Sequence, residues 1–225
     1  MTPPALREWV GGTDIYLLDQ IIKGRITPDM SVLDAGCGAG RNLKYLARVG
    51  AEVWGVDESA EATLAARRNV EAVTGGSAVE RFTCAAIEDM EFEGRVFDVV
   101  ICNAVLHFSR DEGHFNAMVD ALWQVLKTGG LFFARLASSI GIEDRVQLTA
   151  LSRAISEGTG GQSVGWFALP DGSERFLVDE PFLLETTARL GGELLEPLKT
   201  TNVQGLRCMT TWVLRKTPEV SHVRP

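Results

Sequence analysis

Three glycines and two carboxylates form the part of the sequence best suited to chemistry. The glycines stand at positions 36, 38 and 40, directly after the apolar run Ser31–Ala35, which contains Asp34. Glycines let a backbone pass close to a ligand and direct amide N–H groups at it. Asp57 follows seventeen residues after Gly40, at the end of a second apolar run. A carboxylate there can accept hydrogen bonds from both hydroxyls of a ribose, so the pattern predicts a nucleoside-containing ligand.

The spacing of the glycines argues against a nicotinamide dinucleotide. A G-x-G-x-x-G fingerprint starting at Gly36 would require glycine at position 41, where the sequence has Arg41. The carboxylate of Asp34 would repel a pyrophosphate but would orient a cationic ligand. A nicotinamide-dependent oxidoreductase is therefore a disfavoured hypothesis.

Alternating strands and helices must position these residues. Apolar runs predict seven strands, separated in the first half by segments with helical spacing. Right-handed connections between such units give an α/β fold, a doubly wound three-layer sandwich whose sheet is mainly parallel, with an antiparallel last strand. The expected strands are 31–35, 52–56, 81–85, 97–103, 131–136, 193–195 and 208–214.

The 225 residues are expected to form a single domain. Its parts are an N-terminal cap helix within 1–30, capped by Thr13, a cofactor-binding core at 31–136, a substrate-side insert at 137–192, final strands at 193–216 and a loose tail at 217–225. The insert breaks the alternation of strands and helices. It is expected to contain a helix near 143–156 and a hairpin around Pro170-Asp171-Gly172, forming a hairpin and helical cap after the fifth strand.

Together the motifs resemble those of the class I S-adenosylmethionine-dependent methyltransferases, over roughly residues 31–136. The resemblance implies that S-adenosylmethionine is the cofactor and S-adenosylhomocysteine the product. It also implies which residues bind the cofactor. The methionine part would be lined by Asp34, Gly36, Gly38 and Gly40, the ribose held by Asp57, the adenine met by Ala86, Ile87 and Glu88, and the reaction centre bordered by Asn103. The further candidates for cofactor binding are Cys37, Asn42 and Glu58.

The sequence departs from the family pattern at the adenine segment. The acidic residue often found at position 86 is replaced by Ala86, so adenine would rely on backbone contacts and on packing by Ile87. The tripeptide Gly40-Arg41-Asn42 also resembles the sequence at this position in the tellurite-resistance branch of the class.

Five further residues are candidates for binding or catalysis at the site, and each of them could instead have a purely structural role. His107 follows the fourth strand and is either a catalytic base or a packing histidine. Arg135 needs a partner, either an acidic side chain or an anionic group of the substrate. Tyr16 either covers the cofactor or packs on the core. Trp166 and Arg175 either wall the substrate pocket or pack the insert, and His114 is expected to be solvated.

The composition excludes several other classes. With 22 Lys and Arg against 30 Asp and Glu, the net charge is −8, which disfavours DNA as a partner. No apolar run is long enough for a membrane span or signal peptide, so a cytoplasmic location is expected. The four cysteines, Cys37, Cys84, Cys102 and Cys208, form no C-x-x-C pair, so they are expected to be reduced, mostly buried thiols, and no metal site is expected.

The predicted function is transfer of a methyl group to a small-molecule acceptor by in-line displacement. A cofactor-binding regulatory or partner module without turnover is the alternative hypothesis, since the cofactor motif alone does not separate the two. The sequence does not indicate the acceptor or the oligomeric state.

Overall fold

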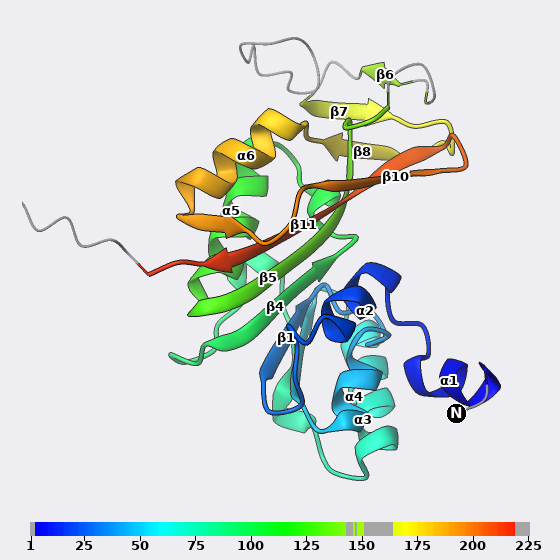
Figure 1. The fold of residues 1–225 in the computed structure, drawn as a ribbon, viewed down its shortest axis with the longest axis vertical. Coiled ribbons are helices and arrows are strands. Elements are labelled where there is room, and N and C mark those ends of the chain that lie inside the picture. Colours follow the sequence, from blue (N-terminus) through cyan, green and yellow to red (C-terminus); the bar gives the residue numbers. More distant parts are fainter. Residues whose placement is uncertain (1–2, 143–145, 147, 151–163, 219–225) are drawn as a thin grey trace, which may run out of the picture.

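A sheet of eight strands runs through the protein, seen here in a computed structural model that describes residues 3–142, 146, 148–150 and 164–218. Seven strands follow the order β10-β11-β5-β4-β1-β2-β3, and β9 pairs with β11 (Figure 1). Neighbouring strands from β1 to β5 are parallel, whereas β11 is antiparallel to β5. The strands are β1 (Ser31–Ala35), β2 (Glu52–Asp57), β3 (Phe82–Cys84), β4 (Phe97–Asn103), β5 (Leu126–Ser138), β9 (Gly192–Leu194), β10 (Lys199–Val203) and β11 (Arg207–Lys216).

Helices cover both faces of the sheet (Figure 1). On one face α2 (Ile15–Ile22), α3 (Leu43–Val49) and α4 (Ala60–Thr74) bury their apolar side chains against the sheet, and α1 (Pro3–Val10) lies against α3. On the other face lie α5 (Glu112–Gln124) and α6 (Glu180–Arg189). The three short 3₁₀ turns are η1 (Val79–Arg81), η2 (Ile87–Asp89) and η3 (Leu106–Phe108).

The expected three-layer α/β fold with its antiparallel last strand is confirmed, and the sheet has one strand more than predicted. The additional strand is β10, which forms a hairpin with β11. Gln204 and Gly205 make the turn between them with φ of 57° and 70°. Every described position of β10 is partly or fully exposed, so the strand lacks the apolar alternation by which a buried strand is found.

The N-terminal segment contains two helices where one was expected. Thr13 does not cap the second helix, because its hydroxyl donates to the Val10 carbonyl at the end of α1, 2.7 Å away. The cap is Asp14, whose carboxylate accepts a hydrogen bond from the Tyr16 amide. The Asp14 amide in turn donates to the side chain of Asn42 at 3.0 Å, which ties the start of α2 to the loop after β1.

The insert after β5 contains the predicted hairpin, formed by β7 (Gly165–Ala168) and β8 (Glu174–Leu177). A short strand, β6 (Thr149–Ala150), adds to it and makes a separate three-stranded sheet. Most of the helix expected near 143–156 lies outside the described residues, and the described pair Thr149–Ala150 is strand instead. Thr149 and Ala150 pair with β7, and this antiparallel pairing holds the two residues in an extended rather than a helical conformation.

Candidate active site

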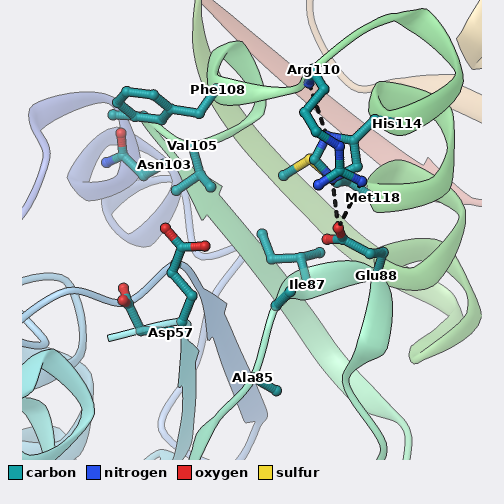
Figure 2. A pocket seen from close by; sticks show the side chains of 14 residues that line it. Asp57, Ala85, Ile87, Glu88, Asn103, Val105, Phe108, Arg110, His114 and Met118 are labelled. Carbon is teal, nitrogen blue, oxygen red and sulfur yellow. Dashed lines mark hydrogen bonds and ion pairs between the residues drawn. The ribbon is translucent and has the colours of Figure 1, made fainter. Parts of the chain in front are cut away.

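A pocket of about 420 Å³ opens where β1, β2 and β4 reach their carboxyl ends. Its size falls in the range of small-molecule sites, and its position is where doubly wound sheets bind ligands. Figure 2 shows Asp57 facing the cavity, with Glu88 across from it. The pocket is lined by Gly36, Asp57, Glu58, Ala85, Ala86, Ile87, Glu88, Asn103, Ala104, Val105, Phe108, Arg110, His114 and Met118.

The glycine loop holds the Asp57 carboxylate in place. The Gly38 amide donates to Asp57 Oδ2 at 2.8 Å, and the Ser59 amide donates to Oδ1 at 3.0 Å. Each carboxylate oxygen can accept more than one hydrogen bond, so both retain capacity toward the pocket. The glycine loop and the Asp57 carboxylate, both predicted from the sequence, are therefore joined by a direct hydrogen bond. This bond and the one from Ser59 fix the orientation of the carboxylate.

Gly36 is required by both its backbone angle and its surroundings. Its φ is 74°, in the left-handed region that favours glycine. A Cβ added there would overlap Cγ2 of Val105, from the segment after β4. The missing side chain therefore lets the loop after β1 lie directly against the loop after β4, at the floor of the pocket.

Asp34 is a buried carboxyl group in β1, 1% exposed. Neither of its oxygens has a hydrogen-bond partner among the described residues. Burial raises the pKa of Asp34 to about 7, with the charge of Arg41 and the nearby Asn42 side chain acting in the opposite direction. Asp34 is not among the residues that line the pocket. A cation near it would favour its ionised form, and its predicted role toward a cationic ligand stays a prediction.

Glu88, His114 and Arg110 form a charged group on the side of the pocket opposite Asp57 (Figure 2). His114 Nε2 lies 2.6 Å from Glu88 Oε1, and the Arg110 guanidinium lies 3.6 Å from the same oxygen. Burial opposes ionisation of Glu88, yet hydrogen bonds from the backbone and His114 and the charge of Arg110 hold its pKa below the ordinary value. The expectation that His114 is solvated is wrong, because α5 turns its side chain, 11% exposed, onto Glu88.

Three residues that line this pocket, Phe108, Arg110 and Met118, were not predicted from the sequence. Phe108 belongs to η3, Arg110 to the short connection before α5, and Met118 to α5, which packs against the segment 87–89. The predicted residues Glu58, Ala86, Ile87 and Asn103 do line it.

Several predicted cofactor residues lie behind the lining rather than in it. Cys37 is buried and its amide donates to the Val56 carbonyl. Gly40 has φ of 75° and packs on Ala66 of α4. Asn42 is buried as the acceptor for the Asp14 amide. These residues shape the loop that carries Gly36 and Gly38, and their direct contact with a cofactor stays a prediction.

His107 is buried in η3 and does not line the pocket. Its Nδ1 accepts a hydrogen bond from the Ala137 amide at 3.1 Å, which places the proton of the neutral ring on Nε2. Burial lowers the pKa of His107 to about 3, and the positive charges of Arg175 and Arg207 add to this effect. The ring is therefore neutral throughout the ordinary working range of pH.

The stability of the protein is expected to depend on pH through His107 and Asp34 in opposite directions. A histidine with a lowered folded pKa loses stability as pH falls from about 6.5 toward 3, because the unfolded chain takes up the proton. Asp34, with a folded pKa raised to about 7, loses stability as pH rises from about 4 to 7. Between about pH 4 and 6.5 the two slopes oppose each other, each at most about 1.4 kcal/mol per pH unit.

Urea unfolding at several pH values measures this balance. We expect His107→Asn to lose stability as pH rises through that range and Asp34→Asn to gain it. If the free energy of unfolding depended on pH in the same way in the wild type and both variants, the pKa shifts assigned to His107 and Asp34 would be contradicted.

The proposed substrate residues border the pocket without lining it. Trp166 Nε1 donates to the Arg110 carbonyl at 2.7 Å, and the Arg175 guanidinium lies 4.6 Å from the ring centre of Phe108. Arg135 has an acidic partner, Asp14 Oδ2, at 3.4 Å from Nη1. Tyr16 packs its ring on Arg135, and its hydroxyl is hydrogen-bonded to Thr201 of β10. The hairpin and the N-terminal segment thus both reach the rim of the site.

In the described part of the chain, no helix is long and apolar enough to cross a membrane. The same residues contain no group of three His, Cys, Asp or Glu side chains that could hold a metal ion. None of the four cysteines forms a disulfide bond within the described part of the chain, and three of them are buried.

Comparison with known proteins shows what the segment around this pocket is similar to. Residues 32–130 match the family described as methyltransferase domain. An uncharacterized methyltransferase of Synechocystis is 32% identical over 123 residues, which are 55% of this chain and 54% of that protein. A ubiquinone biosynthesis O-methyltransferase of Bradyrhizobium is 38% identical over 102 residues, 45% of this chain and 38% of that protein. The chain therefore spans about half or less of the length of these curated relatives.

A solved structure shows the same fold over nearly the whole chain. It is the 1,6-didemethyltoxoflavin-N1-methyltransferase of Burkholderia thailandensis, with 1,6-didemethyltoxoflavin and S-adenosylhomocysteine bound. The TM-score is 0.60 at 22% sequence identity, over 95% of this chain and 79% of that one. Residues 32–130, which contain the glycine loop, β2, β3 and β4, are thus similar to a methyltransferase domain, and the fold of nearly the whole chain is similar to that of a solved methyltransferase.

Proposed function

We propose that this protein transfers a methyl group from S-adenosylmethionine to an oxygen atom of a small molecule. The observation that carries the proposal is the pocket at the ends of β1, β2 and β4, where the glycine loop holds Asp57 ready for a ribose. The matched O-methyltransferase of Bradyrhizobium supports an oxygen acceptor. When bound, S-adenosylmethionine supplies a methyl group already activated on a sulfonium, so the work left to the protein is binding and alignment.

The residues present fit this cofactor. Asp57 would accept hydrogen bonds from the ribose hydroxyls, and the buried, unpaired Asp34 would attract the positive charge of the methionine part. Ile87, 5% exposed, would pack on the adenine beside the alanine at position 86. Holding donor and acceptor in line can lower the barrier by about 7–11 kcal/mol. The pocket walls would also exclude water from the reacting atoms.

Calorimetric titration of S-adenosylhomocysteine tests the cofactor, with NAD as the control ligand. We expect micromolar binding of the first and none of the second. Incubation with S-adenosylmethionine labelled on the methyl group, together with a panel of small phenols, enols and carboxylic acids, tests the reaction. Binding without any labelled product would favour the regulatory module over the enzyme, and no binding to folded protein would refute the proposal.

Binding of the cofactor is expected to release a proton from Asp34. With its pKa raised to about 7, roughly half of Asp34 carries a proton at neutral pH, and a nearby cation favours the ionised form. The affinity for S-adenosylhomocysteine should therefore rise with pH between about 6 and 8. Titrations in two buffers of different ionisation enthalpy measure the released proton. We expect Asp34→Asn to abolish the release, and an unchanged release in this variant would assign the proton to another group.

The general-base role of His107 stays a prediction. Because its neutral ring holds the proton on Nε2 and uses Nδ1 as an acceptor, it has no free lone pair toward a substrate. Turnover by His107→Ala that falls by less than about threefold would exclude this role. The cytoplasmic location, the absence of a DNA partner and the single-domain organisation also stay predictions.

A further inference from the structure

A row of polar side chains crosses three neighbouring strands beside the pocket. Asn103 at the end of β4 is the register partner of Arg135 in β5, and Arg135 is the partner of Thr211 in β11. Directly paired residues of adjacent strands point to the same face of a sheet, so the three side chains share one face. Asn103 also lines the pocket, which makes the row continuous with the candidate active site.

The row contains hydrogen-bonding atoms without partners. Among the described residues, both side-chain atoms of the Asn103 amide, the Arg135 Nε and the Thr211 Oγ1 are buried and unpaired. Asn103 is 7% exposed and Thr211 3% exposed. Buried polar groups are normally paired, so three neighbouring exceptions indicate a place where a ligand supplies the missing partners. Arg135 Nε is a donor, and the Asn103 amide and the Thr211 hydroxyl can each donate as well as accept, so the row can supply three donors to a ligand with acceptor oxygens.

Two arginines share one carboxylate beside the row. Arg135 and Arg41 both face the single carboxylate of Asp14, at 3.4 Å and 4.0 Å. The Tyr16 ring lies 4.9 Å from the Arg135 guanidinium carbon and covers it from the side of α2. The elements around the row carry two other charged groups, Asp34 in β1 and Lys199 in β10. Lys199 forms ion pairs with Asp19 and Glu196.

We propose that the row formed by Asn103, Arg135 and Thr211 binds the acceptor through an acidic hydroxyl of the phenol or enol class, held as its oxyanion. The proposal rests on the proposed function and specifies its substrate class. An arginine beside the oxygen favours the ionised form, so the acceptor would react without a general base. A conjugated ring is the expected carrier, because the pocket offers the Phe108 ring, 52% exposed, beside the row's end.

The step balances without any further reagent. The acceptor hydroxyl loses its proton to solvent on binding at Arg135. An electron pair of the oxygen then forms the new O–CH₃ bond as the CH₃–S bond breaks, and the electrons of that bond return to sulfur as the neutral thioether. The products are the methyl ether and S-adenosylhomocysteine.

Binding of 4-nitrophenol to the protein saturated with S-adenosylhomocysteine tests the proposal, because its phenol and phenolate forms absorb at different wavelengths. The measurement is made about one pH unit below the pH at which the free phenol is half ionised, where about a tenth is phenolate. We expect more than half of the bound probe to be phenolate. Binding of the neutral form, or no binding to the wild type, would overturn the proposal.

Variants then assign the effect to the row. We expect Arg135→Met to weaken phenolate binding at least tenfold and Arg135→Lys, which keeps the charge, to retain part of it. Thr211→Val, close in shape, should weaken binding less. Affinity for S-adenosylhomocysteine should change by less than about threefold in all three. Intact binding of S-adenosylhomocysteine with no difference between wild type and Arg135→Met would refute the acceptor row alone, whereas failure of the wild type to bind S-adenosylhomocysteine would refute the proposed function.

Discussion

Replacing Asp57 with alanine is expected to weaken the binding of S-adenosylhomocysteine at least 100-fold. The carboxylate would lose two hydrogen bonds to ribose hydroxyls, and each hydrogen bond to a charged group contributes about 1.5–3 kcal/mol. The variant also removes the acceptor for the Gly38 amide, 2.8 Å away, so the glycine loop would lose part of its support. Calorimetric titration of wild type and variant with S-adenosylhomocysteine measures the loss.

Two further variants separate recognition of the ribose by Asp57 from a general effect of negative charge near the glycine loop. Glu61→Ala removes an exposed carboxylate from the first turn of α4, near the same loop, and should leave the affinity within about twofold. Asp57→Asn keeps the shape and one acceptor oxygen, so its affinity should fall between those of the wild type and Asp57→Ala. Equal affinity of wild type and Asp57→Ala would show that the ribose is held elsewhere.

Replacing Gly36 with alanine is expected to reduce the stability of the protein by about 3 kcal/mol and to abolish measurable cofactor binding. Two effects add: alanine is disfavoured at a φ of 74° by about 1–2 kcal/mol, and its methyl group would overlap the side chain of Val105. Valine is branched at Cβ and cannot swing away freely, so the loops after β1 and β4 would separate at the pocket floor. Guanidinium unfolding followed by circular dichroism measures the stability.

Gly38→Ala is the matched control for this change. Gly38 also has positive φ, 52°, but a Cβ there would meet no atom within 4 Å. Its loss of stability should therefore be limited to the backbone effect, about 1 kcal/mol. The double variant Gly36→Ala with Val105→Ala should recover the steric part. A Gly36→Ala variant no less stable than Gly38→Ala would contradict the close approach of the two loops.

The residues around the glycine loop were predictable because their signals are local. Alternation of apolar runs and helical spacing gives a parallel sheet, and a parallel sheet places the ends of its strands at one edge. Asp34 and Asp57 each end or nearly end an apolar run, so their position at that edge follows from the sequence alone. Gly36 and Gly38 have the positive φ that glycine is suited to provide.

The adenine side of the pocket was only partly predictable. Ala86, Ile87 and Glu88 belong to a segment that the resemblance singled out, and they line the cavity. The partners of Glu88 come from another part of the chain, because α5 packs on η2 and brings His114 to within 2.6 Å. A histidine on a helix carries no sign of which side chain it will meet, so its environment was predicted wrongly.

The sequence by itself determined the α/β fold and the edge of the sheet at which the candidate site lies, since both depend on patterns along short stretches of chain, and its motifs support the proposed cofactor. Only the tertiary structure decided what lies around that edge. Asn103, Arg135 and Thr211 are far apart in sequence and meet because β4, β5 and β11 are neighbours in the sheet. The pKa shifts of Asp34 and His107 could not be predicted from the sequence either. Both shifts arise mainly from burial, and distant segments of the chain determine how far a side chain is buried.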